Sequence, residues 1–201
     1  MASILRNLAR AQQRNHRKTM NKQIIYFPKD GKPTVVANEW QVWDGERDEG
    51  GIPDLEHGLH KVLVPFHWWI THHKNADVIT RANKGEIGVW FAADDDILKH
   101  ADLIEEGKSL WPVVGAHFPI FRDGRSFSTA ALLRDRFSWT GEVRAIGDVL
   151  IDQLLQGARV GFDAFELRPD QNLDIGLKQF DLFSVTTQNS WRDQRSMQEV
   201  N

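Results

Sequence analysis

A regular alternation of strand-like and helix-like segments occupies the second half of this 201-residue chain. Short apolar runs rich in β-branched and aromatic residues indicate strands, and amphipathic spacing between them indicates helices. Strands are expected at 86–92, 112–121, 143–146 and 162–167, and helices at 94–106, 128–137, 149–160 and 173–183. Strands that alternate with helices form right-handed βαβ units, so the sequence predicts an α/β fold with a parallel sheet or partial barrel.

A smaller β-rich segment is expected before this alternating part, over residues 23–43. Short β-branched runs flank the turn at 29–33, where lysine, aspartate, glycine and proline occur together. Such a turn between β-branched runs is typical of a hairpin or another small antiparallel element. Residues 44–53 are acidic and glycine-rich and are expected to be a loop, whereas residues 54–81 have a mixed pattern.

The expected domain organisation is one α/β domain over residues 23–188, after an extension over 1–22 and before a polar tail over 189–201. The extension is basic, with no acidic residue before Asp30, and basic polar segments of this kind rarely bury enough surface to become ordered. Its few apolar residues could instead form a short amphipathic helix, as in a transit peptide or a membrane-surface segment. Met20 precedes the first strand, which allows the residues before it to be an upstream extension of the coding frame.

Composition excludes several classes of protein. The net charge of −3 gives no broad surface for nucleic acid. The absence of cysteine excludes disulfides, catalytic thiols and iron–sulfur clusters held by the chain's own thiolates. No apolar run approaches the roughly 20 residues of a transmembrane helix, and no signal-peptide core is present, so a cytoplasmic location is expected.

Polar residues follow each predicted strand of the alternating part. In parallel sheets and barrels, ligands bind beyond the carboxyl ends of the strands. We therefore expect the following residues to converge on one rim: Asp94 to Asp96, Asp123 to Arg125, Gly147 with Asp148, and Arg168 with Asp170.

A candidate anion site lies in this rim. Gly124 can take a positive φ in a tight turn, Ser128 can cap the following helix, and the free amides of a first helical turn attract anions. With Asp123, Arg125 and Arg168 nearby, the guest would be sulfate, sulfite, phosphate or a carboxylate. The alternative is that Asp123 and Arg125 pair locally and nothing binds.

A second group of rim residues is a candidate partner surface. Asp148 is expected to cap the helix at 149–160, and Asp152 and Gln153 fall outside its apolar face, where they either are solvated or contact a partner. Arg144 differs from these residues because it lies within a short strand with apolar neighbours. A buried arginine must be paired, and Glu142 or Glu166 could pair with it.

Metal and cofactor signals are weak. His57 and His60 would share a helix face, but no metalloprotease signature is present, and no metal is predicted. Asp94 to Asp96 could suggest magnesium, although acidic residues at a helix start are favoured by the helix dipole. The chain has no phosphate loop, no dinucleotide fingerprint and no nucleophile elbow, so the cofactor remains unknown.

Several long motifs of this chain resemble the bacterial domain of unknown function 934 family, over about residues 23–188. The resemblance is carried by Phe118-Pro-Ile-Phe-Arg-Asp-Gly-Arg-Ser-Phe-Ser128, Leu132-Leu-Arg134, Gly141-Glu-Val-Arg-Ala-Ile-Gly-Asp-Val-Leu150, Asp152-Gln-Leu154 and Gly161-Phe-Asp-Ala-Phe165. Where members usually read Asp-Gly-Arg-Gly this chain has Ser126, and where many read Arg-Cys-Gly-Phe-Asp it has Val160. Because Val160 stands where many members have cysteine, a catalytic thiol at that position is not required in this member.

The resemblance also implies a function. Members of the family are described as oxidoreductases involved in sulfite reduction, because their genes lie beside those for assimilatory sulfite reductase. We therefore expect an accessory protein or oxidoreductase component of assimilatory sulfite reduction that acts with sulfite reductase or its electron donor. The alternative is a small enzyme that binds an anionic sulfur compound or a phosphorylated cofactor at the strand ends. Whether the chain is an enzyme stays open at this point.

Overall fold

The computed structural model describes residues 23–44, 60–182 and 189–192. Their strands form a single eight-stranded sheet with the order β2-β1-β8-β7-β6-β5-β4-β3. Strands β3 to β8 are parallel, and β1 pairs antiparallel with both β2 and β8. The strand bounds are β1 Gln23–Tyr26, β2 Thr34–Ala37, β3 Trp40–Val42, β4 Lys61–Pro65, β5 Ile87–Phe91, β6 Val113–Phe118, β7 Glu142–Gly147 and β8 Ala164–Phe165.

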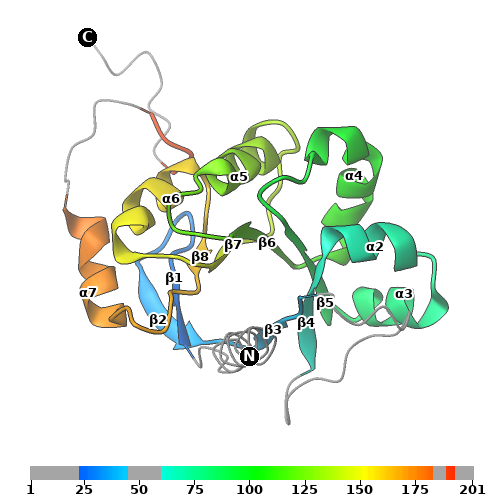
Figure 1. The fold of residues 1–201 in the computed structure, drawn as a ribbon, viewed down its shortest axis with the longest axis horizontal. Coiled ribbons are helices and arrows are strands. Elements are labelled where there is room, and N and C mark those ends of the chain that lie inside the picture. The colour runs from blue at the N-terminus through cyan, green and yellow to red at the C-terminus, as the bar shows by residue number, and fades with distance from the viewer. Residues whose placement is uncertain (1–22, 45–59, 183–188, 193–201) are drawn as a thin grey trace, which may run out of the picture.

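Helices alternate with the parallel strands and cover the outside of the sheet (Figure 1). Their bounds are α2 Phe66–His72, α3 Ala76–Asn83, α4 Ala101–Leu110, α5 Arg125–Asp135, α6 Leu154–Val160 and α7 Leu173–Leu177. Short 3₁₀ turns occur at η1 Ile97–His100, η2 Ile151–Gln153 and η3 Lys178–Asp181. None of the helices in the described ranges is long and apolar enough to cross a bilayer.

The sheet curls into a partial barrel. Strands β2 and β3 are the two edges of the sheet, yet only Asn38 and Glu39 separate them in the chain. Three peptide units span at most about 11 Å, so the two edges must come close together. Figure 1 shows the strands arranged around a ring with the helices outside it. The predicted α/β fold, with a partial barrel after a small β-rich segment, is confirmed.

Two separate apolar clusters lie on the two faces of this curled sheet. The larger one joins outward residues of the strands, such as Val64 and Val89, to helix residues such as Leu133. The smaller one contains alternate residues of the same strands and no helix residue: Trp40, Leu63, Trp90, Val113 and Ile146. Because successive strand residues point to opposite faces, this second cluster fills the inside of the barrel.

Several element ends differ from the prediction. The strand expected at 112–121 ends at Phe118, since Pro119 has no N–H to continue the ladder. The helix expected from residue 128 begins at Arg125. The helix expected over 149–160 begins only at Ile151, because Leu150 is extended, and it consists of the 3₁₀ turn η2 followed by α6. The mixed region 54–81 supplies β4, α2 and most of α3.

Some expectations lie outside the described residues. These are the extension over 1–22, the loop from residue 45 with His57, and residues 193–201 of the expected tail. Residues 189–192 of that tail are described, and they pack on the domain, as the contacts of Trp191 and Arg192 below show.

Candidate functional site

The polar residues at the carboxyl ends of β6, β7 and β8 meet at one rim, as the sequence predicts. Asp148 joins them: its Oδ1 accepts from Arg168 Nη1 at 2.9 Å and its Oδ2 accepts from the backbone N–H of Phe121 at 2.9 Å. Gln153 donates to the carbonyl of Phe121 at 2.9 Å and accepts from the N–H of Leu150 at 2.9 Å. Three loops are therefore fastened together by side chains.

Asp123 and Arg125 form an ion pair with each other. This local pairing is the alternative to the predicted anion site. Arg125 donates from Nε to Oδ1 at 2.9 Å and from Nη2 to Oδ2 at 2.6 Å. These hydrogen bonds lower the pKa of Asp123 to about 2. The charge of Asp94 also acts on Arg125, so the loop after β5 lies within electrostatic reach of the same rim.

Arg168 is paired in the same manner. It donates to Asp170 at 2.7 and 2.8 Å as well as to Asp148. Its hydrogen bonds to Asp170 and then to Asp148 raise its pKa, and the pKa of Asp170 falls to about 2 because of Arg168. Both rim arginines therefore already hold carboxylates of their own chain.

Three local predictions at the rim are wrong. Gly124 is the N-cap residue of α5 with a φ of −84°, and the rim glycine with positive φ is Gly147, at 94°. Ser128 lies inside α5 and is exposed, so it cannot cap that helix. Asp148 does not cap a helix, because the extended Leu150 separates it from η2 and its carboxylate is engaged by Phe121 and Arg168.

Buried Ser126 fastens the start of α5 to the sheet. Its hydroxyl donates to the carbonyl of His117 in β6 at 2.6 Å. This contact was not predicted, because it depends on the helix starting three residues earlier than expected.

Large apolar side chains are exposed at this rim. Ile120 and Phe121, which follow β6, are 50% and 45% exposed, and Leu98 in η1, which follows the neighbouring strand β5, is 50% exposed. The guanidinium of Arg122 lies 5.8 Å from the centre of the Phe121 ring. The rim thus combines exposed apolar groups with paired charges.

Arg144 is not a rim residue, which corrects its assignment to the partner surface. It is 2% exposed and lies inside the barrel, where its Nε donates to Glu142 at 2.7 Å, the pairing predicted above. Its Nη1 donates to Asn38 at 2.8 Å, and Asn38 in turn donates to Glu166 at 3.2 Å. Asn38 was not predicted as a partner of Arg144, because the two residues are 106 positions apart in the sequence and meet only inside the barrel.

The opposite end of the barrel contains a buried charged cluster that sequence reasoning also missed. Arg134 of α5 donates to the carbonyls of Gly161, Trp139 and Gly141 at 2.6–2.9 Å and to the carboxylate of Asp163. Its side chain is 0% exposed. Most arginines near a helix end are solvated. The sequence around Arg134 therefore does not indicate that its side chain is buried.

Residues 189–192 complete this cluster. Trp191 lies 4.1 Å from the guanidinium of Arg134. Arg192 donates to the carbonyls of Phe27 and Pro28 and forms a longer ion pair with Asp163 at 3.8 Å.

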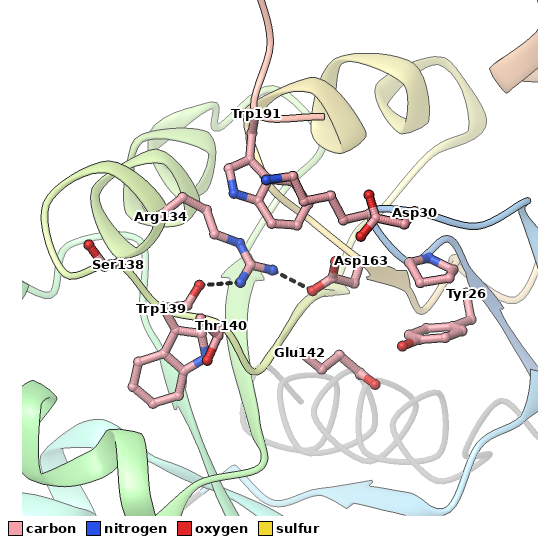
Figure 2. Close-up of a pocket in the computed structure, with 11 residues that line it drawn as sticks. Tyr26, Asp30, Arg134, Ser138, Trp139, Thr140, Glu142, Asp163 and Trp191 are labelled. Atoms are coloured by element: carbon pink, nitrogen blue, oxygen red, sulfur yellow. Dashed lines mark hydrogen bonds and ion pairs between the residues drawn. The ribbon is translucent and has the colours of Figure 1, made fainter. Parts of the chain in front are cut away.

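A pocket of about 470 Å³ opens beside this cluster (Figure 2). It lies at the amino end of the parallel strands, where β7 begins at Glu142 and the antiparallel β1 ends at Tyr26. Figure 2 shows Arg134 pointing toward Asp163, with Trp139 and Trp191 on different sides of this pair. The residues that line it are Tyr26, Pro28, Lys29, Asp30, Arg134, Ser138, Trp139, Thr140, Glu142, Asp163 and Trp191.

The described residues contain no group of three or more histidine or acidic side chains placed to hold a metal ion. His72 and His73 each contact backbone carbonyls of their own helix through Nδ1. Of the three acids after β5, Asp95 accepts from the N–H of Ala92 at 2.6 Å and Asp96 pairs with Lys99 at 3.2 Å.

Comparison with known proteins gives one finding. The model of a family described as a bacterial protein of unknown function, DUF934, matches residues 88–198, which is more than half of the chain. No curated protein and no solved structure matches the chain.

Proposed function

Because this chain belongs to the bacterial family DUF934, and its motifs resemble proteins whose genes lie beside that for assimilatory sulfite reductase, we propose that it is an accessory protein of sulfite reduction. It docks on sulfite reductase through the carboxyl rim of its barrel. The observation that carries the proposal is the exposure of the Ile120 and Phe121 side chains. The polar side chains around them are held by hydrogen bonds to the backbone of Phe121.

An exposed apolar centre with a polar border is the common arrangement of a protein interface. Here the border is supplied by the pair of Asp123 with Arg125 and by Arg168 with its two aspartates. The backbone of Phe121 is held on both sides, by Asp148 and by Gln153, so its ring is carried on a fixed loop. A fixed loop loses little conformational entropy when a partner binds.

The predicted partner residues Asp152 and Gln153 lie beside this apolar centre. Asp152 is exposed, and Gln153 contacts Phe121 through the hydrogen bond to its carbonyl. The hydrogen bond from Gln153 therefore joins η2 to the loop after β6.

The pairing of the rim arginines favours docking over the alternative of anion binding. An anion at Arg125 or Arg168 would have to compete with a carboxylate that is already held by two hydrogen bonds. Charge-assisted bidentate pairs are among the stronger polar contacts of proteins. The same pairs can remain intact in a docked complex.

The first test is capture of purified sulfite reductase by the tagged chain at low salt. We expect Phe121→Asp and Ile120→Asp each to weaken capture at least about tenfold, because a charge would be buried at the centre of the interface. Leu182→Asp is the matched control, since Leu182 is an equally exposed apolar residue away from the rim loops. Equal capture by all three variants would show that the rim is not the docking surface.

The second test is growth of a deletion strain on sulfate, sulfite or sulfide as the sulfur source. We expect growth on sulfide alone, with full rescue by the wild type and by Leu182→Asp but not by Phe121→Asp. Normal growth of the deletion strain on all three sources would contradict the proposed role.

The alternative function, an enzyme that binds an anion at the rim, predicts a different result in the same deletion strain. If Arg125→Ala abolishes rescue while capture of sulfite reductase is unchanged, the rim acts as an anion site and the docking proposal fails. We expect Arg125→Ala to change capture only slightly, because exposed ion pairs contribute little.

A further inference from the structure

The loops at the carboxyl rim carry more negative charge than the loops at the other end of the barrel. Four segments follow β5 to β8 at the rim: 92–100, 119–125, 148–153 and 168–172. They contain seven aspartates and four basic side chains, so their formal charge is −3 with histidine neutral. Five segments lie at the amino end: 27–33, 83–86, 111–112, 135–142 and 159–163. They contain five acidic and five basic side chains and have no net charge.

Ion pairs within the rim leave part of this charge uncompensated. Two pairs are neutral, since each joins one acid to one base: Asp96 with Lys99, and Asp123 with Arg125. Arg168, in contrast, lies between two carboxylates, those of Asp148 and Asp170. One guanidinium and two carboxylates keep one negative charge among them.

Two further aspartates have no basic partner in the described part of the chain. Asp94 and Asp152 are both exposed, and neither forms an ion pair there. Asp95 accepts from a backbone N–H. Among the basic side chains of the four rim segments, Arg122 alone has no carboxylate partner in the described ranges. The charge that remains unpaired at the rim is therefore negative in sum.

The helices that begin at this end reduce the negative charge but do not cancel it. The amino end of an α-helix carries roughly half a positive charge. Helices α4 to α7 begin after β5 to β8, so together they add at most about two positive charges to the formal charge of −3. The rim therefore keeps a negative potential.

The acidic side chains lie next to the exposed apolar ones. Leu98, which is 50% exposed, belongs to the same segment as Asp94. Asp152 adjoins Gln153, whose amide donates to the carbonyl of Phe121. Buried apolar groups supply most of the free energy of binding at an interface, whereas the charges around them set the rate of encounter and reject partners of like charge.

We propose that the rim docks on a basic patch of sulfite reductase, in which lysine or arginine side chains border an apolar recess. The recess receives Ile120 and Phe121, and the basic side chains lie opposite Asp94 and Asp152. This inference rests on the docking function proposed above, to which it adds the charge of the partner's surface. A second copy of this chain does not fit the same rim, because two acidic rims would repel each other.

The test is the rate of association of the full chain with purified sulfite reductase on a biosensor, at ionic strengths from about 50 to 300 mM. The rate constant of the wild type should fall as the ionic strength rises, since salt screens the attraction between opposite charges. At the lowest ionic strength, Asp152→Lys should slow association at least about threefold, and Arg122→Glu should accelerate it.

Two matched controls separate the charge of the rim from the charge of the whole protein. Asp135→Lys and Arg136→Glu make the same changes of charge at exposed positions at the amino end of the barrel. We expect both controls to associate at nearly the wild-type rate, because the docking surface lies at the opposite end.

Several results would overturn the inference. Faster association of Asp152→Lys, or slower association of Arg122→Glu, would show that the partner's surface is acidic. Equal rates for Asp152→Lys and Asp135→Lys would show that only net charge matters. A wild-type dimer in sedimentation that Phe121→Asp abolishes would assign the rim to a second copy. Binding that does not depend on ionic strength would overturn this inference alone, whereas no binding of the wild type at any ionic strength would overturn the proposed docking function as well.

Discussion

Arg134 shows how one side chain can organise a region of this protein. Its guanidinium lies out of solvent, where an unpaired charge would be very costly. The protein meets this cost with the carbonyls of Gly161, Trp139 and Gly141 and the carboxylate of Asp163. Gly161 is required at its position, because its φ is 121° and a Cβ there would lie 2.5 Å from Arg134 Cγ. The Gly-Phe-Asp motif thus has a structural role.

Replacement of Asp163 by alanine should therefore strongly destabilise the folded protein. The change leaves Arg134 without its carboxylate and removes the acceptor for the N–H of Val143, which lies 3.0 Å away. We expect a loss of about 3–5 kcal/mol in the free energy of unfolding, measured by urea denaturation. Asp123→Ala breaks an ion pair whose arginine is exposed, and it should hardly change the denaturation midpoint. Similar small effects from both variants would mean that Arg134 is solvated.

At the scale of elements, the sequence predicts the order of strands and helices better than their ends. Apolar runs such as the one in β6 and the helical spacing between them are local signals, so the alternation can be identified. The start of α5 depends on Ser126 reaching the carbonyl of His117, which is a tertiary contact. The rim residues Asp148 and Arg168 could be predicted because parallel strands end at one edge.

The amino-end pocket could not be predicted in the same way. It needs the hairpin turn at Lys29, the end of α5 and the distant Trp191 to come together. No periodic pattern relates these positions, and only the curling of the sheet brings them close together.

The segment 189–192 is held mainly by Arg192. Its guanidinium donates to the carbonyls of Phe27, Pro28, Ala158 and Phe162, so it ties β1, α6 and the start of β8 together. Burial lowers the pKa of Arg192 to about 10, which still leaves it charged at neutral pH.

Arg192→Ala should consequently release this segment. Loss of four hydrogen bonds from a charged donor predicts a decrease of about 2–4 kcal/mol in stability, after partial replacement by water. Chymotrypsin should also cleave after Trp191 faster than in the wild type. Arg136→Ala, at an exposed position on α5's end, should change neither quantity. If cleavage after Trp191 is unchanged, other contacts must hold the segment.

At the scale of the whole molecule, the barrel has two ends of different character. The carboxyl end presents exposed apolar groups within a border of ion pairs, and the amino end holds a pocket beside a buried charged cluster. Between them, Asn38 at the β2–β3 connection joins Arg144 of β7 to Glu166 after β8. This network crosses the interior where the two edges of the sheet approach each other, so it stabilises the curled shape of the sheet.

The network predicts a dependence of stability on pH. Burial raises the pKa of Glu166 above its ordinary 4.5, and Arg144 and the hydrogen bond from Asn38 only partly oppose this. A raised pKa in the folded state means that the folded protein binds the proton more tightly than the unfolded chain. The stabilisation from Glu166 is therefore complete below pH 4.5 and is lost as the pH rises through the folded-state pKa.

Glu166→Gln should isolate this effect, because the amide oxygen can still accept from Asn38 while the charge is absent. We expect the variant to be more stable than the wild type at pH 8 and equally stable near pH 4, in urea denaturation series at each pH. Glu105→Gln, which changes an exposed glutamate, should give the same difference from wild type at both pH values. A Glu166→Gln protein that is less stable than the wild type at pH 8 would mean that attraction to Arg144 outweighs the cost of burial. The carboxylate would then stabilise the partial barrel as a charged group.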